Sequence, residues 1–452
     1  MSPKRPINAD VPAEETAAAK GDAAPTPTPA APTPPATPTP PPPSRRRSIP
    51  GAVKAIVALV VVAVIFIVVA VIGGSGSDSD SGPTSPAPTP VATDRPAETP
   101  SAQTAEQLGY PTFATGNTTR VGGPDFQANA AAVALAVFPS TTPSQRPAAV
   151  TLVSGEDPAI AIAASVLMAA PVRAPLLFSG VGPGLPPAAQ MALDALDPQG
   201  DGATGGAALL RIGNAFAPTG EKTTSVPSGS QAAQAAGIAA LRDRLFGSPP
   251  KHFVIAPGAE PAFAMPAAAW AARSGDPVLF ADGDQLPGPT AAALKRHPDV
   301  PVYVLGPASA ISAKAVRAIA KIDPKVRRVA GKDPVANAIA FARYADGSFG
   351  WNINDPGHGF VLARDDAPFE AGAAAPLSAS GTWGPLLLSD SATTLPKALR
   401  EYFLDVKPGY TTNPTRAFYN HVWVIGDQEA IDVNQQAEVN ELAELAKIGG
   451  GE

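Results

Sequence analysis

A set of four landmarks recurs three times, in the same order, along residues 112–446, and this repetition constrains the fold more than any other feature. The first landmark is a short strand, a turn containing glycine or proline, and an alanine-rich helix. Its copies are TTRVGGPDFQANAAAVAL at 118–135, TTSVPSGSQAAQAAGIAAL at 223–241 and VRRVAGKDPVANAIAFARY at 326–344. Coincidence does not explain three matching sets, so the sequence predicts three related units.

The other three landmarks are also strands and helices. The second is a strand leading into a small-residue helix, with a proline suited to the first helical turn: Pro158, Pro261 and Pro368. The third is an apolar strand that begins with proline: 174–180, 276–283 and 384–391. The fourth is an apolar strand that ends in glycine: Gly213, Gly306 and Gly426. Apolar runs without alternation are typical of strands that are covered on both faces.

Alternating strands and helices predict the α/β class, with three tandem Rossmann- or flavodoxin-like repeats of mostly parallel sheet and flanking helices. We place repeat 1 at 112–222, repeat 2 at 223–325 and repeat 3 at 326–446, followed by a short tail at 447–452. Each unit has about 100 residues, which is enough to form a core of its own. The sequence therefore predicts three homologous domains.

A second constraint lies near the N-terminus, where residues 55–72 read AIVALVVVAVIFIVVAVI without a polar side chain. With its flanks, the segment 51–74 is long enough for a transmembrane helix across the lipid bilayer. Arg45, Arg46, Arg47 and Lys54 precede or open it, so the N-terminus is predicted to be cytoplasmic and the repeats extracellular. We expect a single-pass protein of the cell membrane.

Proline-rich segments flank the apolar one, at 1–50 and 75–111, and such composition predicts disorder. The extracellular segment would hold the repeats away from the bilayer. The tract at 24–43 favours extended polyproline II structure. It is either a solvated tail or a spacer or ligand for a cytoplasmic proline-recognising partner.

Composition and motifs argue against catalysis. The chain has no cysteine, and its four histidines lie far apart without metal-ligand spacing, so we expect no metal or cofactor. The turns after the glycine-ended strands carry no phosphate-binding glycine motif, and GxSxG does not occur. Asp365, Asp366 and Glu370 form an acidic group near a strand end, which would either bind a cation or sit, solvated, at a helix N-terminus.

The landmarks resemble the cell wall binding repeat 2 family of Gram-positive bacteria, over about residues 112–445. The family's opening element matches twice, and the middle repeat has Ser225 in place of the arginine. The matching residues are Arg120, Val121, Gly123 and Asp125, then Arg328, Val329, Gly331 and Asp333. The strand-opening prolines Pro175, Pro277 and Pro385 match as well.

The family's helix-opening aspartate is replaced by Ile160, Phe263 and Glu370, so repeats 1 and 2 depart furthest from the pattern. The resemblance implies three repeats around a pseudo-threefold axis that bind anionic wall polymer, polysaccharide or teichoic-type, without a covalent bond. It makes Arg120, Asp125, Arg328, Asp333 and Glu370 candidate ligand-binding residues. For the two arginines, a structural ion pair or sheet-edge contact is the alternative.

Charge gives an independent constraint on the partner. Residues 1–54 carry seven basic and four acidic side chains, so the remainder has 26 basic against 35 acidic, a net charge of −9. A chain this acidic is not a general polyanion binder, and we expect no nucleic-acid partner. One basic group recurs at helical spacing, Lys314, Arg317 and Lys321, followed by further cations up to Lys332. This group either contacts polymer phosphates or is a solvated helix face.

The primary hypothesis is a membrane-anchored extracellular protein that binds cell-wall polymer and is not an enzyme. Two alternatives are also compatible with the sequence. One is an envelope enzyme accessory or wall-remodelling factor. The other is a scaffold whose degenerate repeats bind a protein partner.

Overall fold

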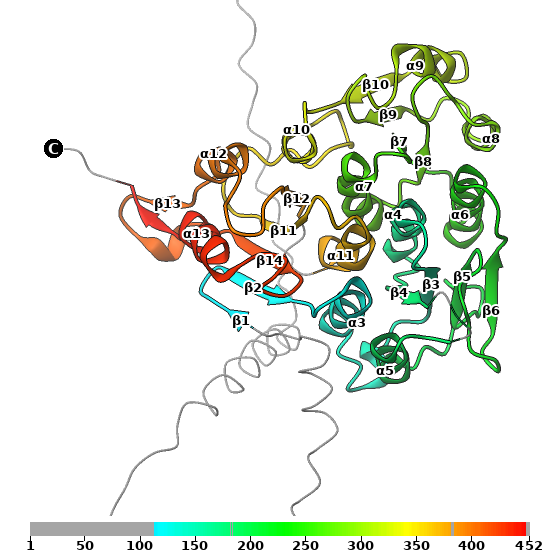
Figure 1. Ribbon diagram of the computed structural model, residues 1–452, viewed down its shortest axis with the longest axis horizontal. Helices are drawn as coiled ribbons and strands as arrows, with labels where there is room; N and C mark the ends of the chain where they lie inside the picture. Colours follow the sequence, from blue (N-terminus) through cyan, green and yellow to red (C-terminus); the bar gives the residue numbers. More distant parts are fainter. Residues whose placement is uncertain (1–112, 181, 183, 381–383, 449–452) are drawn as a thin grey trace, which may run out of the picture. The chain divides into compact units, whose positions relative to one another are not determined.

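The computed structural model describes residues 113–448, except 181, 183 and 381–383 (Figure 1). The predicted cytoplasmic tail at 1–50, transmembrane helix at 51–74 and linker at 75–111 lie outside this range. Within it, every helix is too short or too polar to cross a bilayer.

The described chain contains three parallel sheets built to one plan, which confirms the predicted α/β class with flanking helices. In the first sheet the strand order is β4-β3-β5-β6, and in the second it is β8-β7-β9-β10. Numbered along the chain, both orders read 2-1-3-4, the beginning of the flavodoxin-like order. The first sheet comprises β3 (Val150–Ser154), β4 (Leu176–Ser179), β5 (Leu209–Ile212) and β6 (Thr223–Val226). The second comprises β7 (Phe253–Ala256), β8 (Val278–Phe280), β9 (Val302–Leu305) and β10 (Val326–Val329).

The third sheet follows the same plan with a strand from the other end of the described chain. Its order is β12-β11-β14-β2, and β1 adds an antiparallel edge. β2 is parallel to β14, with Arg120 opposite Val424. The strands are β11 (Gly359–Arg364), β12 (Leu386–Ser389), β14 (His421–Ile425), β2 (Thr118–Val121) and β1 (Phe113–Ala114). A short parallel pair, β13 (Gly409–Tyr410) with β15 (Ala446–Lys447), lies apart from it.

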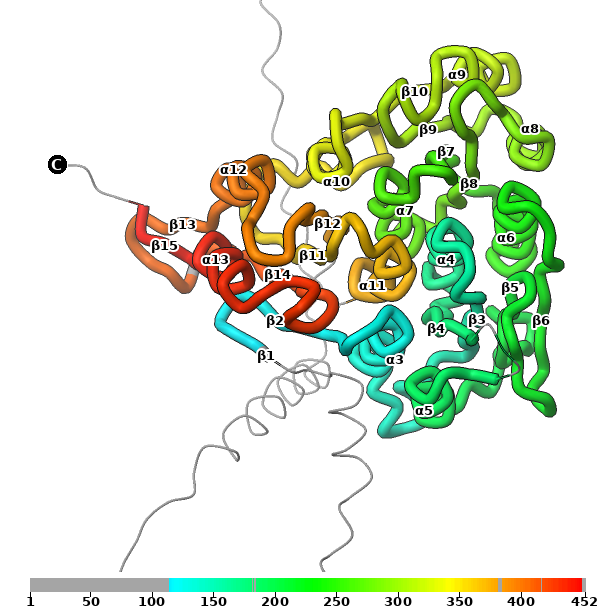
Figure 2. The backbone as a smooth tube through the Cα atoms, viewed as in Figure 1, coloured from blue at the N-terminus to red at the C-terminus, as the bar shows by residue number. Residues whose placement is uncertain are grey.

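The strand that opens each predicted unit thus belongs to the sheet of the preceding unit. β6 pairs with β5, β10 pairs with β9, and β2 pairs with β14. Figure 2 shows this closure, with the cyan strand β2 beside the red-orange strand β14. The boundaries 112–222, 223–325 and 326–446 remain predictions about sequence units, whereas the sheets are offset from them by one strand.

Three helices that follow the first strand of each sheet pack against one another: α4 (Pro158–Ala164), α7 (Pro261–Ser274) and α11 (Phe369–Ala379). They are rich in alanine, and such small side chains let helix backbones approach closely. A Cβ on Gly372 of α11 would lie 2.8 Å from the Ala161 Cβ of α4. This contact fixes the spacing of two sheets.

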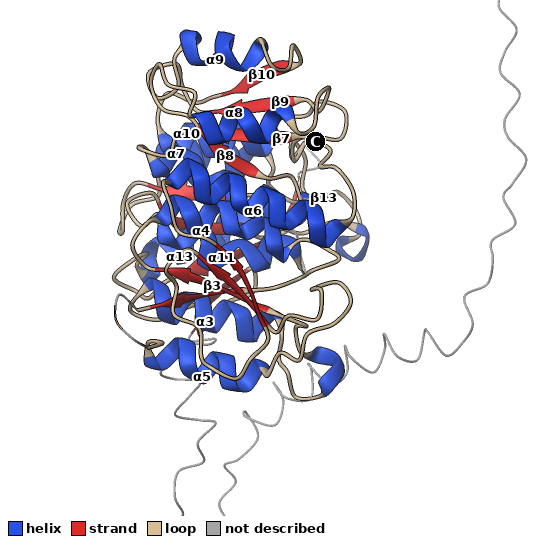
Figure 3. Ribbon diagram, turned by 90° about the vertical axis from the view of Figure 1, so that its right-hand side faces the viewer, coloured by secondary structure: helices blue, strands red, loops and turns tan. Residues whose placement is uncertain are grey.

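A second set of helices carries the chain from one sheet to the next: α3 (Phe126–Val137), α6 (Gln231–Phe246) and α10 (Pro334–Arg343). Helix α3 packs on α11 and also on β4, and α6 and α10 make the corresponding pairs of contacts. Figure 3 shows the strands lying between helices. The other helices are α5 (Pro187–Leu196), α8 (Gly288–Lys295), α9 (Ala313–Ala320), α12 (Lys397–Asp405) and α13 (Val433–Ala443), with 3-10 turns η1 (Pro143–Gln145), η2 (Ser165–Met168) and η3 (Pro414–Arg416).

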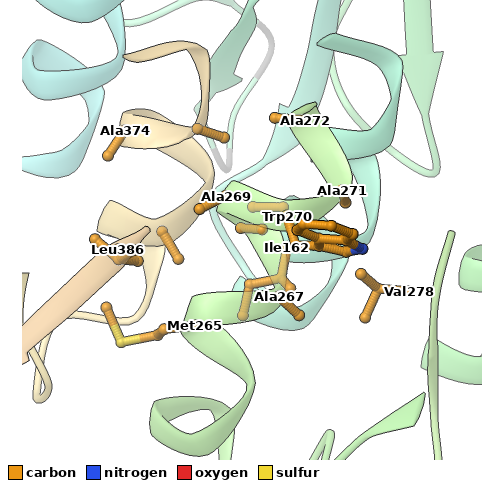
Figure 4. Packing of buried hydrophobic residues seen from close by; sticks show 14 of the residues in the cluster. Ile162, Met265, Ala267, Ala269, Trp270, Ala271, Ala272, Val278, Ala374 and Leu386 are labelled. Atoms are coloured by element: carbon orange, nitrogen blue, oxygen red, sulfur yellow. The ribbon is translucent and has the colours of Figure 1, made fainter. Parts of the chain in front are cut away.

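The buried apolar side chains of all three sheets form one continuous cluster. Figure 4 shows Ile162 of α4, Trp270 of α7 and Ala374 of α11 within it. The three sheets therefore share one core. The reason is that α4, α7 and α11 bury their apolar surfaces against one another as well as against their sheets.

We expect Gly372→Ala to lower the free energy of unfolding by about 1–3 kcal/mol, because the new methyl group overlaps Ala161. Glycine to alanine inside a helix ordinarily stabilises, so the predicted sign is the reverse of the usual one. Gly288→Ala, where a Cβ meets no atom within 4 Å, is the matched control and should be neutral or stabilising. Urea unfolding of both variants measures this, and an unchanged midpoint for Gly372→Ala would contradict the packing.

Candidate functional site

Arg120 on β2 is buried, with 1% of its surface exposed. Its Nη1 donates to the carbonyl oxygen of Gly426 at 3.0 Å, and its Nη2 donates to that of Ile431 at 2.5 Å. Its Nε and Nη2 both donate to the Oε1 of Gln436, at 3.1 and 2.8 Å. The guanidinium therefore clamps the turn after β14, and its hydrogen-bonding capacity is used within the protein.

Arg328 on β10 repeats the arrangement in the second sheet. It donates to the carbonyl oxygens of Gly306 and Ile311, and the bond to Ile311 measures 2.6 Å. In both sheets the acceptors are the strand-ending glycine and the fifth residue after it. The first sheet has Ser225 at this position, and the Nε of Arg211 donates to its hydroxyl at 3.1 Å. The two arginines thus contact carbonyls of the neighbouring strand end, and the first sheet lacks the clamp.

Asp125 and Asp333 are helix N-caps. The Oδ1 of Asp125 accepts from the Ala128 N–H at 2.8 Å, and the Oδ1 of Asp333 accepts from the Ala336 N–H at 2.7 Å. Four residues after each cap stands an asparagine, Asn129 or Asn337, whose Oδ1 accepts from the preceding glycine turn. A capping aspartate satisfies amide groups that a helix start leaves unpaired. The opening motif therefore builds a strand, a turn and a helix.

Glu370 lies in the first turn of α11 and is buried. Its Oε1 accepts from Asn129 Nδ2 at 2.6 Å, whereas its Oε2 has no hydrogen-bond partner among the residues that the structure describes. Burial, and secondarily the nearby charges of Asp125 and Asp427, raise the pKa of Glu370 to about 8, against the opposing effect of the Asn129 bond. The carboxyl is therefore mostly protonated at neutral pH.

The predicted acidic group is not brought together as a cation site. Asp366 is exposed and pairs with Arg364 at 2.8 Å, while Glu370 is enclosed. Burial and then Asp366 raise the pKa of Asp365. The described residues contain no cluster of three acidic or histidine ligands suited to a metal ion. Pro368 occupies the N-cap position of α11, so a capping role for Asp365 or Asp366 is not seen either.

The predicted basic residues do share one exposed helix face. Lys314 and Arg317 lie on α9, and Lys321 is its C-cap. Lys314 Nζ lies 3.3 Å from the Asp284 carboxylate, whose pKa is lowered by bonds from Ser312 and Lys314. Arg317 adds a weaker attraction to the same carboxylate. Asp284 thus offsets part of the charge of Lys314 and Arg317, and this face, with its three cations, stays positive.

Sequence reasoning missed a second exposed surface, in the long connection between β13 and β14. Phe418 and Tyr419 are 71% and 66% exposed there. A nearby groove of about 330 Å³ is lined by Tyr410, Asn413 and Ile448, among others. Aromatic faces beside hydroxyl and amide groups suit the mixed apolar and polar surface of a sugar. The signal in the sequence was the length of this loop compared with the middle unit.

The carboxyl edge of a doubly wound sheet is the usual place for a ligand. In the first sheet the cavity at this edge, between Ser154, Asp157 and Asn214, has a volume of about 40 Å³. That is far below the range of about 300–1,000 Å³ that small-molecule sites occupy. The surfaces on α9 and around Phe418 are therefore better candidates for a ligand site than this edge of the first sheet.

Comparison with known proteins supports the fold. No family model and no curated protein matches this sequence. The structure is similar to that of Cwp8 from Clostridium difficile, with a TM-score of 0.54 and 20% identity, covering 72% of this chain and 51% of that one. It is also similar to Cwp6 from Clostridium difficile, with a TM-score of 0.55 and 17% identity, covering 72% and 47%. The chain spans about half the length of these proteins, and the likeness establishes a shared fold.

We predict that Arg120→Met destabilises the protein more than Arg328→Met. Losing Arg120 leaves several buried carbonyls without donors, at a cost of about 3–5 kcal/mol, whereas Arg328 is half-exposed and makes two such bonds. Chemical denaturation compares the two. Equal losses of unfolding free energy in the two variants would contradict the larger role assigned to the buried Arg120.

We predict that Glu370→Gln flattens the dependence of stability on pH. Burial raises the pKa of Glu370 from its ordinary value of 4.5 to about 8 in the folded protein. The neutral carboxyl therefore contributes its full stability below the unfolded pKa, and this stability is lost as pH rises through the folded pKa of about 8. At about pH 9 the wild type should lose on the order of a few kcal/mol that the variant keeps. Thermal unfolding across this range measures it, and parallel curves would contradict it.

Proposed function

We propose that this chain is a cell-wall-binding protein of the cell wall binding repeat 2 type, and that it is not an enzyme. The observation that carries the proposal is the shared fold with Cwp8 and Cwp6, which are cell wall proteins. The motif residues Arg120, Asp125, Arg328 and Asp333 support it in another way. Their side chains hold the turns and helix starts of the fold, so binding falls to the exposed surfaces that this framework presents.

The polymer is anionic and is held without a covalent bond, with the α9 face of Lys314, Arg317 and Lys321 as its first contact. A local cluster is needed because residues 55–452 carry a net charge of −9, which repels a polyanion from most of the surface. The groove beside Phe418 and Tyr419 would contact sugar rings. The proposal also includes the membrane anchor at 51–74, with the described body outside the cell.

A scaffold role is the second candidate, and one observation favours it. Ser225 takes the place of the clamping arginine in the first sheet, so the three sheets are not equivalent binding units. In this role the body would hold a protein partner at the wall.

The test is co-sedimentation of the purified full-length chain with isolated cell walls, before and after removal of their anionic secondary polymers. Wild-type protein should sediment with intact walls and stay in solution with stripped walls. Reversing Lys314, Arg317 and Lys321 to glutamate should weaken retention by at least about tenfold and reduce its salt dependence.

The matched control reverses Arg244, Lys251 and Lys295, three exposed cations of the same sequence unit that lie on other elements. It changes the net charge by the same amount and should retain near-wild-type binding. Equal losses in both variants would show that only overall charge matters. Equal retention of the wild-type protein on intact walls and on walls without the secondary polymers would contradict the proposal.

A further inference from the structure

A cavity of about 300 Å³ opens at the amino edge of the first sheet. It lies where α3, η1 and the turn before β4 meet, and its lining includes Phe138, Arg146, Pro147, Pro171 and Arg173. The volume is at the lower end of the range for small-molecule sites. The cavity faces away from the carboxyl edge of this sheet. It shares no lining residue with the groove near Phe418, and it lies outside α9, which belongs to the second sheet.

Arg173 occupies a backbone position that disfavours it. Its φ is 50°, in the left-handed region where a Cβ is crowded. The second sheet has Gly275 at the same place, two residues before the strand-opening proline, with a φ of 75°. The first sheet thus keeps an arginine where the backbone favours glycine, and strained residues of this kind cluster at functional sites.

The Arg173 side chain is exposed at the cavity and held by one neighbour. Its guanidinium carbon lies 5.5 Å from the centre of the Phe138 ring. Across the described residues, no carboxylate forms an ion pair with it. The guanidinium is therefore available to an anion that enters the cavity.

Arg146 supplies a second guanidinium to the same cavity. It pairs with Asp197, which fixes its orientation, and its buried Nε has no acceptor in the described part of the chain. Asp201 is an acidic residue of the lining, and its Oδ1 accepts from the Thr204 N–H at 3.0 Å. The cavity is thus lined by two guanidinium groups and by the Asp201 carboxylate, one oxygen of which already accepts a hydrogen bond.

We propose that this cavity binds a phosphate- or carboxylate-bearing molecule of sugar size. Guanidinium groups match the planar oxygens of these anions with paired hydrogen bonds. Both arginines are already held in place, by Asp197 and by Phe138, which lowers the entropic cost of binding. The proline side chains of the lining would contact the uncharged body of the ligand. The proposal does not depend on the polymer-binding role of α9.

The test is calorimetric titration of the full-length chain with glucose 6-phosphate, glucuronate, inorganic phosphate and glucose. The charged sugars should bind with roughly millimolar affinity or better, and glucose should not bind. Arg173→Gly should weaken binding by at least about tenfold while its thermal midpoint stays at or above that of the wild type, because glycine relieves the backbone strain. A variant that loses function and gains stability is not explained by damage to the fold.

Arg173→Ala keeps the strain and removes the charge, so it should lose binding without the gain in stability. Arg244→Ala, at an exposed helical position, should leave binding unchanged. Wild-type affinity in Arg173→Gly, or equal binding of glucose and glucose 6-phosphate, would overturn the proposal.

The source of the anion is decided by the same variant in wall sedimentation. Loss of retention in Arg173→Gly assigns the anion to the polymer. Retention at the wild-type level, together with lost sugar-phosphate binding, assigns it to a free small molecule. Either result supports the site, and a failure of α9 variants to affect retention leaves it intact.

Discussion

The pairing of β2 with β14 is the contact on which the whole arrangement depends. It supplies the fourth strand of the third sheet from the beginning of the described chain, and so joins its two ends. Arg120 lies on this strand and clamps the turn after β14, so the strand and the turn stabilise each other. Because β2 leads directly into α3, which packs on both α11 and β4, the same contact also sets the first sheet against the third.

One consequence is a division between buried framework and exposed surface. The residues that recur between units, such as Arg120 with Arg328 and Asp125 with Asp333, make hydrogen bonds within the protein. The features found in one unit only, such as Phe418 and Arg173, face the solvent or a cavity. The residues shared between repeats therefore build the fold, and the residues that differ between repeats form the surfaces where the protein can bind a ligand.

Much of the fold could be predicted from the sequence, because strand and helix signals are local. Apolar runs ending in glycine gave β5, β9 and β14, and prolines at helix starts gave α4 and α7. The offset of the sheets could not be predicted, since pairing of Thr118–Val121 with either neighbour leaves the local pattern unchanged. The positions of some candidate residues could also be predicted. Helical spacing placed Lys314, Arg317 and Lys321 on one face. The environment of Glu370 could not be predicted, because it includes Asn129, which is distant in sequence.

The central claim is that three sheets form one cooperative body closed by β2, and native-state hydrogen exchange tests it most directly. The amides of β14, at the closure, and of β7, in the second sheet, should exchange only through global unfolding and with the same free energy of opening. That result would agree with the single continuous core. Exchange of β14 at a clearly lower free energy, independent of β7, would show that the third sheet opens on its own and would contradict the account.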